Sequence, residues 1–181
     1  MSRDEFAVEE RSKEVVDDAL QHLTFVLGKE TYAVDILCVE EIKSGETVTP
    51  IPRTPDYIKG VINLRGAIVP VVDLRERFNI VPSSQRPVDV VIILNIEGKD
   101  GRRTVGAIVD DVADVVGFSE DSIKPSPDLG SKISTQFIHG IVTVDDQVII
   151  ALNHNRLFSL EELSRLDDVE AMAEEDGDSE D

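Results

Sequence analysis

The chain has 181 residues, of which 41% are apolar but only 4% aromatic, and its formal net charge is −19 at pH 7. This length suits one domain or two small ones, and a core poor in aromatic residues must be built mainly from Val, Ile and Leu, which favour β structure. The sequence has no cluster of Lys and Arg of the kind that binds nucleic acid or an anionic membrane surface, so we exclude both as direct partners.

The acidic charge is concentrated at the two ends of the chain. Residues 161–181 have a net charge of −10 and residues 1–20 a net charge of −4, which leaves −5 of the total −19 for residues 21–160. We therefore expect an acidic N-terminal arm, a nearly balanced domain, and a C-terminal segment that continues a short helix into an acidic tail. Two explanations of the acidity remain open: tails that keep the protein soluble, or adaptation to a salt-rich cytoplasm.

The sequence predicts a soluble cytoplasmic protein. Its single cysteine, Cys38, excludes an internal disulfide, as expected in a reducing compartment, and its apolar neighbours predict a buried thiol rather than a reactive one. The N-terminus lacks the apolar core of a signal peptide. The longest aliphatic run, from Val90 to Leu94, is too short to span a bilayer, so we expect no insertion into the membrane.

Most of the chain shows the pattern of short strands. Residues 5–20 have weak helical spacing and are expected to form a frayed helix or a disordered arm. From residue 22 to residue 158, short apolar runs alternate with turn residues, which is typical of β-strands. The expected strands are residues 22–27, 31–36, 39–43, 47–51, 61–64, 67–73, 88–96, 104–109, 112–118, 138–144 and 147–153.

Turn and helix signals separate these strands and follow them. Gly28–Glu30, Gly98–Gly101 and Asp145–Asp146 are typical of hairpin turns. Ser159–Glu162 matches a capping box and predicts a short helix near the C-terminus. The acidic run beyond Asp167 has no apolar anchors, so we expect it to be disordered.

The sequence contains an internal repeat. Four segments of the first half match four segments of the second half, in the same order and at offsets of 73, 75, 80 and 80 residues. Because chance rarely supplies four ordered matches, we infer two similar β units of about five strands each. A unit of roughly 65 residues is marginally stable alone, so the two units are expected to share an apolar contact. The matching pairs are Tyr32–Ile42 with Val105–Val115, Val48–Pro52 with Ile123–Pro127, Ile58–Val61 with Ile138–Ile141, and Ile68–Phe78 with Val148–Phe158.

The sequence shows no catalytic constellation and no metal site. None of the three histidines has a second His or Cys at zinc-ligand spacing, and no catalytic or nucleotide-binding motif is present. The crowded carboxylates of Asp110, Asp111 and Asp114 support an alternative hypothesis, a small β-barrel enzyme. Solvated positions in a turn and on a strand face explain these aspartates better. We therefore expect a binding protein that needs no cofactor.

Two charged residues lie among apolar neighbours. Glu41 follows Val39 in one expected strand, and Arg65 lies between two apolar strands in the segment Ile62–Ile68. The planar fork of an arginine can satisfy a carboxylate or carbonyl groups at a strand corner, or it can be offered to a partner. The residues alone leave both roles of Arg65 open.

The sequence resembles the CheW family over roughly residues 22–160. The resemblance is carried by the stretch Lys-Gly-x-x-Asn-Leu-Arg-Gly at Lys59–Gly66, which is followed by a Pro-x-x-Asp strand at Pro70–Asp73. Further matching segments are Tyr32–Leu37, Val39–Ile42, Ile51–Pro52, Thr54–Pro55, Val105–Asp110, Val112–Val115, Ile123–Pro125 and Gly140.

The resemblance implies a mainly β fold in which two SH3-like five-stranded barrel lobes pack on a shared core, followed by a short C-terminal helix. In residues 21–160, we expect the first lobe to comprise about residues 21–84, with residues 147–160 as a candidate addition. The second lobe is then expected to comprise about residues 85–146.

The resemblance also implies a function in chemotaxis, a form of two-component signal transduction. CheW-like adaptors couple methyl-accepting receptors to the histidine kinase CheA by binding alone, and they are recruited to membrane-associated receptor arrays. The same module occurs at the end of CheA and in CheV-type fusions, but this chain has no room for a kinase or receiver domain, so we expect a free-standing adaptor. Which receptors and which kinase it serves, and whether the output is motility, stay open.

The family likeness implies two sets of binding residues. Kinase contact uses the ends of the lobes, which implies Lys124, where the family often has Arg, and Leu129, where an aromatic residue is common; the kinase partner is the CheW-like regulatory domain of CheA. Receptor contact in the family falls in the groove between the lobes. In this sequence that groove implies the receptor-binding residues Val39, Glu41, Arg65, Val90, Gly106 and Val112.

Overall fold

The computed structural model describes residues 20–80, 89–98, 101–125, 135–158, 161–166, 168 and 171. The expected N-terminal arm and most of the expected acidic tail lie outside these ranges. The strands are β1 (Leu20–Leu27), β2 (Glu30–Asp35), β3 (Val39–Ser44), β4 (Ile58–Leu64), β5 (Ala67–Asp73), β6 (Val90–Gly98), β7 (Gly101–Val109), β8 (Asp111–Phe118), β9 (Ile138–Val144) and β10 (Gln147–Leu152). The helical segments are η1 (Ile36–Cys38), α2 (Leu74–Arg77), η2 (Glu120–Ser122), η3 (Thr135–Phe137), η4 (His154–Arg156) and residues 161–166.

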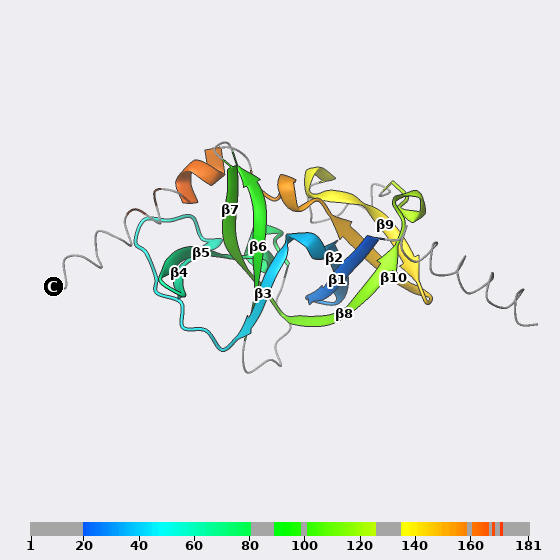
Figure 1. Cartoon of the computed structure of the whole chain (residues 1–181), viewed down its shortest axis with the longest axis horizontal. Coiled ribbons are helices and arrows are strands. Elements are labelled where there is room, and N and C mark those ends of the chain that lie inside the picture. Colours follow the sequence, from blue (N-terminus) through cyan, green and yellow to red (C-terminus); the bar gives the residue numbers. More distant parts are fainter. Residues whose placement is uncertain are drawn as a thin grey trace, which may run out of the picture.

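The strands form two five-stranded sheets, which confirms the mainly β fold class. The first sheet has the strand order β8-β1-β2-β10-β9, and the second has the order β3-β6-β7-β5-β4. Neighbouring strands are antiparallel, except that β10 is parallel to β2 and β5 is parallel to β7. Figure 1 shows the first sheet on the right and the second sheet on the left, with β1, β2, β3 and β6 near the middle of the molecule.

The internal repeat appears in the sheet orders. If each of β1 to β5 is exchanged with the strand five numbers later (β1 with β6, β2 with β7, and so on), the strand order of the first sheet becomes that of the second. Each sheet therefore contains the first two strands of one repeat and the last three strands of the other. The chain crosses from the first sheet to the second at η1, after β2, and returns at Asp110, after β7.

This exchange of hairpins corrects the expected lobe boundaries. Residues 20–35 do not share a sheet with residues 39–73, because β1 and β2 pair with β8 and β10. The expected addition of residues 147–160 to the first lobe is correct for only part of that lobe. Strand β10 lies beside the β1–β2 hairpin, in a different sheet from β3, β4 and β5. A boundary near residue 84 separates the two repeats along the chain, but each repeat contributes strands to both sheets, so the sheets cannot follow that boundary.

Three clusters of buried side chains hold the fold together. The largest is shared by the sheets and contains, for example, Phe25 from β1 and Ile92 from β6. The second sheet has a cluster of its own that includes Val91, and the first sheet has one that includes Ile149. Alternate residues of β6 thus face the shared core and the second sheet's own core, which explains the continuous apolar run of this strand.

The expected strands agree with the structure to within three residues, with one exception. Residues 47–51 form no strand and contribute only an isolated bridge between Thr49 and Val61. Pro50 and Pro52 lack the N–H groups that a strand needs for regular pairing. The expected C-terminal helix is present over residues 161–166 and buries Leu163 and Leu166.

The same close backbone approach occurs once in each repeat. Thr49 exchanges two backbone hydrogen bonds of 2.9 Å with Val61, and Lys124 exchanges two of 2.8 Å with Ile141. A Cβ atom at Gly60 would lie 2.0 Å from the carbonyl oxygen of Thr49, and one at Gly140 would lie 2.5 Å from that of Lys124. A glycine before the bridged strand residue is therefore required for these contacts.

Gly60→Ala is expected to lower the free energy of unfolding more than the control Gly66→Ala. Gly66 also has a positive φ, of 88°, but no atom lies within 4 Å of its added Cβ. The control variant should therefore lose only the free energy that the backbone conformation costs, about 1–2 kcal/mol. The clash at Gly60 adds about 1–3 kcal/mol. Urea denaturation of both variants measures the difference. Equal losses of unfolding free energy in the two variants would contradict the close approach of Gly60 to the backbone of Thr49.

Cys38 is a buried thiol, as the sequence indicates. Burial, and secondarily the nearby Asp35, raises the pKa of the Cys38 thiol to about 12, and its Sγ lies 2.9 Å from the carbonyl oxygen of Asp35. The thiol is therefore protonated and inaccessible at neutral pH.

We expect iodoacetamide to modify Cys38 at pH 8 only when the protein is unfolded, because alkylation needs an accessible thiolate. Mass spectrometry of samples treated in buffer and in urea measures both rates. Modification of the folded protein at the rate seen in urea would show that the thiol is not buried in solution.

Candidate functional site

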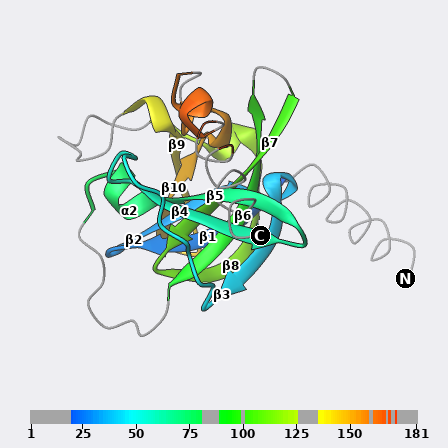
Figure 2. The same ribbon diagram turned by 90° about the vertical axis from the view of Figure 1, so that its left-hand side faces the viewer.

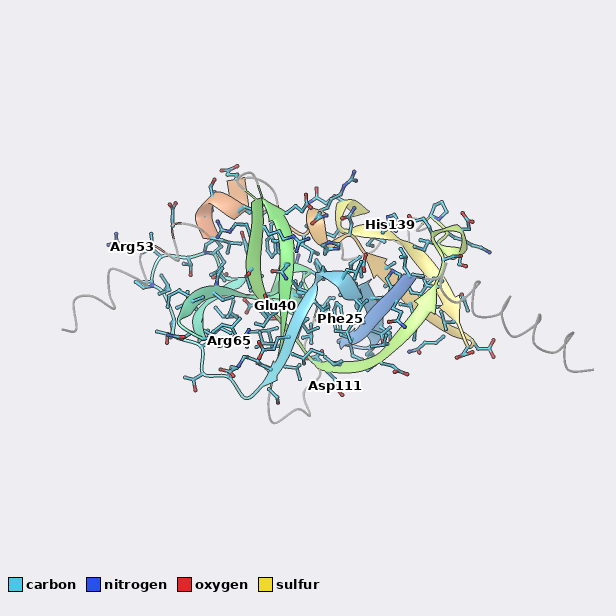
Figure 3. All side chains as sticks on the ribbon, viewed as in Figure 1. Phe25, Glu40, Arg53, Arg65, Asp111 and His139 are labelled. Carbon is cyan, nitrogen blue, oxygen red and sulfur yellow. The ribbon has the colours of Figure 1, made fainter. Side chains whose placement is uncertain are left out.

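Arg65 lies at an exposed turn of the second sheet and is held there by carboxylates. It occupies the turn between β4 and β5 with a φ of 51°, and its side chain is 67% exposed. Its Nη1 lies 3.0 Å from Oε2 of Glu41, and its Nη2 lies 3.8 Å from Oε1 of Glu40. Figure 3 shows Arg65 and Glu40 close together on the second sheet. Both roles that the sequence left open are thus present: the guanidinium pairs with a carboxylate and also faces solvent.

This contact joins opposite edges of the second sheet. Glu41 lies on β3, at one edge, whereas the turn that carries Arg65 follows β4, at the other. The sheet must therefore curl until its edges meet, as in a barrel. Exposed ion pairs contribute only about 0.2–1 kcal/mol, so this pair orients the guanidinium more than it stabilises the fold.

The ion pairs continue along β3. Lys43 lies 3.6 Å from Oε1 of Glu41 and 3.3 Å from Oε1 of Glu46. We call the set Arg65, Glu40, Glu41, Lys43 and Glu46 the charged strip. The sequence reasoning selected only two of these five residues as binding residues, although the closely spaced charges of Glu40, Lys43 and Glu46 around Glu41 were a signal for the others.

Apolar side chains are exposed beside the charged strip. Ile42 on β3 is 45% exposed, and Leu37 in η1 is 82% exposed. The equivalent of Ile42 in the second repeat, Val115 on β8, is also 45% exposed. Figures 1 and 2 both place β3 next to the start of β8, at the boundary between the sheets. These three side chains were not among the expected binding residues, and they give the boundary an apolar character.

The other expected receptor-binding residues take two different positions. Val39 and Val112 are half-buried and pack against the shared core, and Val90 is a buried member of that core. Gly106 is buried in the second sheet, where an added Cβ would lie 3.0 Å from Cγ1 of Val91. The three valines therefore lie along the junction of the sheets, whereas Gly106 can affect the junction only through packing.

The expected kinase-binding residues lie away from Arg65. Lys124 is exposed on a segment that bridges to Ile141 of β9, at the edge of the first sheet. Leu129 lies outside the described residues. Lys124 thus lies on a different sheet from Arg65, although one of the expected receptor-binding residues, Val112 on β8, belongs to the first sheet.

The three crowded aspartates do not form an acid–base site. Asp110 is only 1% exposed: its Oδ1 accepts a hydrogen bond of 2.9 Å from Arg75, and its Oδ2 accepts one of 2.6 Å from the backbone N–H of Gly28. Its interpretation as a solvated turn residue is wrong, because the crossing of the chain between the sheets buries it. Asp111 and Asp114 each accept a hydrogen bond from the backbone N–H of the following residue. Each carboxylate is engaged in local or structural bonding.

The histidines are likewise explained by structure, and His139 is paired with the carboxylate of Glu120. Burial lowers the pKa of both His22 and His154, and the ring of His22 stacks on Phe118 with 3.8 Å between centroids. Within the described ranges, no three His, Cys, Asp or Glu residues are arranged to hold a metal ion. The helices in this part of the chain include none long and apolar enough to cross a membrane.

Comparison with known proteins agrees with this geometry. Residues 21–162 match the family model of the CheW-like domain. The chain is 40% identical to chemotaxis protein CheW of Klebsiella aerogenes over 149 residues, which cover 82% of this chain and 87% of that protein. It is 35% identical to chemotaxis protein CheW of Treponema pallidum over 156 residues, which cover 84% of this chain and 89% of that protein.

A solved structure has the same fold. The crystal structure of scaffolding protein TtCheW from Thermoanaerobacter tengcongensis matches with a TM-score of 0.70 at 38% identity, over 78% of this chain and 93% of that one. The sequence relatives are chemotaxis proteins and the structural relative is a scaffolding protein. The chain therefore belongs to the CheW family and is a chemotaxis adaptor that acts by binding rather than by catalysis.

Proposed function

We propose that this adaptor links methyl-accepting chemoreceptors to the regulatory domain of the histidine kinase CheA, in the cytoplasm, at membrane-associated receptor arrays. The observation that carries the proposal is the position of Arg65. An exposed guanidinium is oriented by Glu41 and lies beside the apolar junction of the sheets. This combination of an oriented charge and an apolar surface suits a helix that carries one apolar stripe.

The receptor helices would place their apolar stripe along the sheet junction. The exposed side chains of Ile42 and Val115 supply apolar contact there, and Val39 and Val112 lie half-buried behind them. Arg65 is a cation in a chain with a net charge of −19, so it favours an acidic residue of the receptor. Such a residue would compete with Glu41 for the guanidinium and would fix the register of the helix.

The kinase would bind at the edge of the first sheet that β9 forms. Lys124 is exposed at the edge of the first sheet, whereas Arg65 belongs to the second. Because the two surfaces do not overlap, one adaptor can hold both partners. A change in the receptor would then alter the populations of kinase states through the differential affinity of the adaptor for those states.

Arg65→Glu is expected to abolish receptor-dependent control of the kinase without unfolding the adaptor. The variant reverses the oriented charge, and we expect its affinity for a soluble receptor fragment to fall about a hundredfold, as at an interface hot spot. Its free energy of unfolding should change by less than about 1 kcal/mol, because the ion pair is exposed. Reconstitution with receptor and kinase measures the control, and urea denaturation measures the stability.

Arg53→Glu is the matched control for this experiment. Arg53 is exposed and also has a positive φ, of 64°, so its replacement makes the same change of charge in a similar backbone conformation, outside the charged strip. It should support normal receptor control. If Arg65→Glu also supports normal stimulation of the kinase, the assignment of the receptor surface is wrong.

Removal of residues 168–181 is expected to leave receptor binding intact, within about twofold in affinity. The truncation keeps the helical residues 161–166, including the buried Leu163 and Leu166. The lost residues carry acidic charge, which salt screens at physiological ionic strength. Isothermal titration of both forms with the receptor fragment measures the affinities. A large loss in the truncated form would show that the tail is a receptor contact.

A further inference from the structure

Arg75 is a buried cation at the end of β5, on the short helix α2. Its side chain is 9% exposed, and its Nε and Nη2 donate hydrogen bonds of 3.0 Å to the two carboxylate oxygens of Asp73. Its Nη1 lies 2.9 Å from Oδ1 of Asp110 and 3.2 Å from Oδ1 of Asp89. One guanidinium thus joins three aspartates from separate segments of the chain.

Asp110 connects this group to the first sheet. It is the residue at which the chain leaves β7 and enters β8. While Oδ1 binds Arg75, Oδ2 accepts a hydrogen bond from Gly28 in the β1–β2 turn, and the backbone N–H donates one of 3.0 Å to Val26 on β1. We call Asp73, Arg75, Asp89 and Asp110 the crossing network, because it fixes one of the two points where the chain passes between the sheets.

The other crossing has neutral residues at the positions that correspond to Asp73, Arg75 and Asp110, and the carboxylate of Asp35 caps η1 there by accepting a hydrogen bond of 2.9 Å from the backbone N–H of Leu37. By the offset of 80 residues in the repeat, Asn153 and Asn155 take the places of Asp73 and Arg75. Asn153 accepts a hydrogen bond from the backbone N–H of Asn155, and Asn155 accepts one from that of Glu97, both of 3.1 Å. At the offset of 73 residues, Leu37 takes the place of Asp110 and is 82% exposed. The fold can therefore make a crossing without an arginine at this position, so chain topology alone does not require Arg75.

The crossing network is adjacent along the chain to two of the expected receptor-binding residues. Asp89 precedes Val90, and Val90 pairs with Val109, which precedes Asp110. Val112 follows Asp110 by two residues. The carboxylates on either side of Arg75 are thus within two residues of Val90 and Val112 along the chain.

We propose that Arg75 is a positioning residue for partner binding: through Asp89 and Asp110 it holds Val90 and Val112 in the geometry that the receptor recognises. This inference rests on the proposed function for the role of those valines. An arginine fork has fixed directions, so paired carboxylates are held in orientation as well as distance. Because buried charges left without partners are strongly disfavoured, the network has few alternative arrangements.

Asp89→Asn is the sharpest test, because Asp89 is half-exposed and its loss should not unfold the protein. Its side chain is 50% exposed, and the substitution removes one charge that faces Arg75. Two quantities are measured: the methyl NMR resonances of Val90 and Val112, and the affinity for a soluble receptor fragment. We expect both sets of resonances to shift and the affinity to fall about three- to tenfold, in the range of coupled neighbouring residues.

Glu97→Gln is the matched control. It removes the same charge near the opposite end of the same strand, β6, and should move neither the two valine resonances nor the affinity. Unchanged valine resonances in Asp89→Asn would overturn the proposal. Shifted resonances with unchanged affinity would also overturn it, because the network would then hold the valines without serving the partner.

Asp110→Asn provides a second test from inside the network. An asparagine has one carbonyl oxygen, which cannot replace both carboxylate oxygens that bind Arg75 and Gly28. Ile149→Ala, in the first sheet's own core, is the control: it lowers the stability of the protein without touching the crossing network. Well below its unfolding temperature, Asp110→Asn should shift the valine resonances and bind the receptor fragment more weakly than Ile149→Ala. Equal affinities in the two variants would reduce Asp110 to a structural role and overturn the proposal.

The design separates this inference from the proposed function. If Arg65→Glu retains full affinity for the receptor fragment, the receptor surface itself is misassigned. If Arg65→Glu loses affinity while Asp89→Asn and Asp110→Asn behave like their controls, the receptor surface stands and the role of Arg75 is rejected.

Discussion

The structure depends on the apolar core that the two sheets share. The chain crosses between the sheets after β2 and after β7, so the first sheet is built from two separate pieces of the sequence, and the strands of the second sheet, β3 to β7, lie between those pieces along the chain. Side chains such as Phe25 and Ile92 meet in the common cluster from opposite sheets. The first sheet can therefore form only when the two ends of the domain meet, and both sheets bury apolar side chains in the shared cluster, so the molecule is best understood as one folding unit with two barrels.

This constraint determines what the adaptor can do with its surface. Because the sheets are joined by core packing and by two crossings, Arg65 on one sheet and Lys124 on the other keep a fixed separation and orientation. The ion pair of Arg65 with Glu41 adds little stability, but it fixes the direction of a charge on this rigid frame. Stability thus comes from the interior, which also holds in place the exposed groups that we propose for recognition.

Much of the fold follows from local sequence patterns, whereas the exchange of hairpins does not. The alternation of apolar runs and turn residues predicts the strands, and the ordered matches predict two similar units. A strand of one repeat has nearly the same pattern as its counterpart, so periodicity cannot say which unit it will join. Only long-range packing decides this, and it places β1 and β2 beside β8 and β10.

The candidate site was predictable to a similar extent. Arg65 and Glu41 stand out because they are charged residues among apolar neighbours, and their contact is present. Asp110 stands out only as one of three crowded aspartates, and Arg75 does not stand out, since an aspartate between two strands and an arginine after a strand look like ordinary surface residues. Their burial is a consequence of the crossing at Asp110, which no pattern near either residue reveals.

Simultaneous binding of both partners tests the central claim most directly. The adaptor is first saturated with a soluble receptor fragment and then titrated with the kinase regulatory domain, and sedimentation velocity follows the species formed. Binding surfaces that do not overlap predict a complex that contains all three proteins. Release of the receptor fragment as the kinase domain binds would show that the surfaces overlap and would contradict the account.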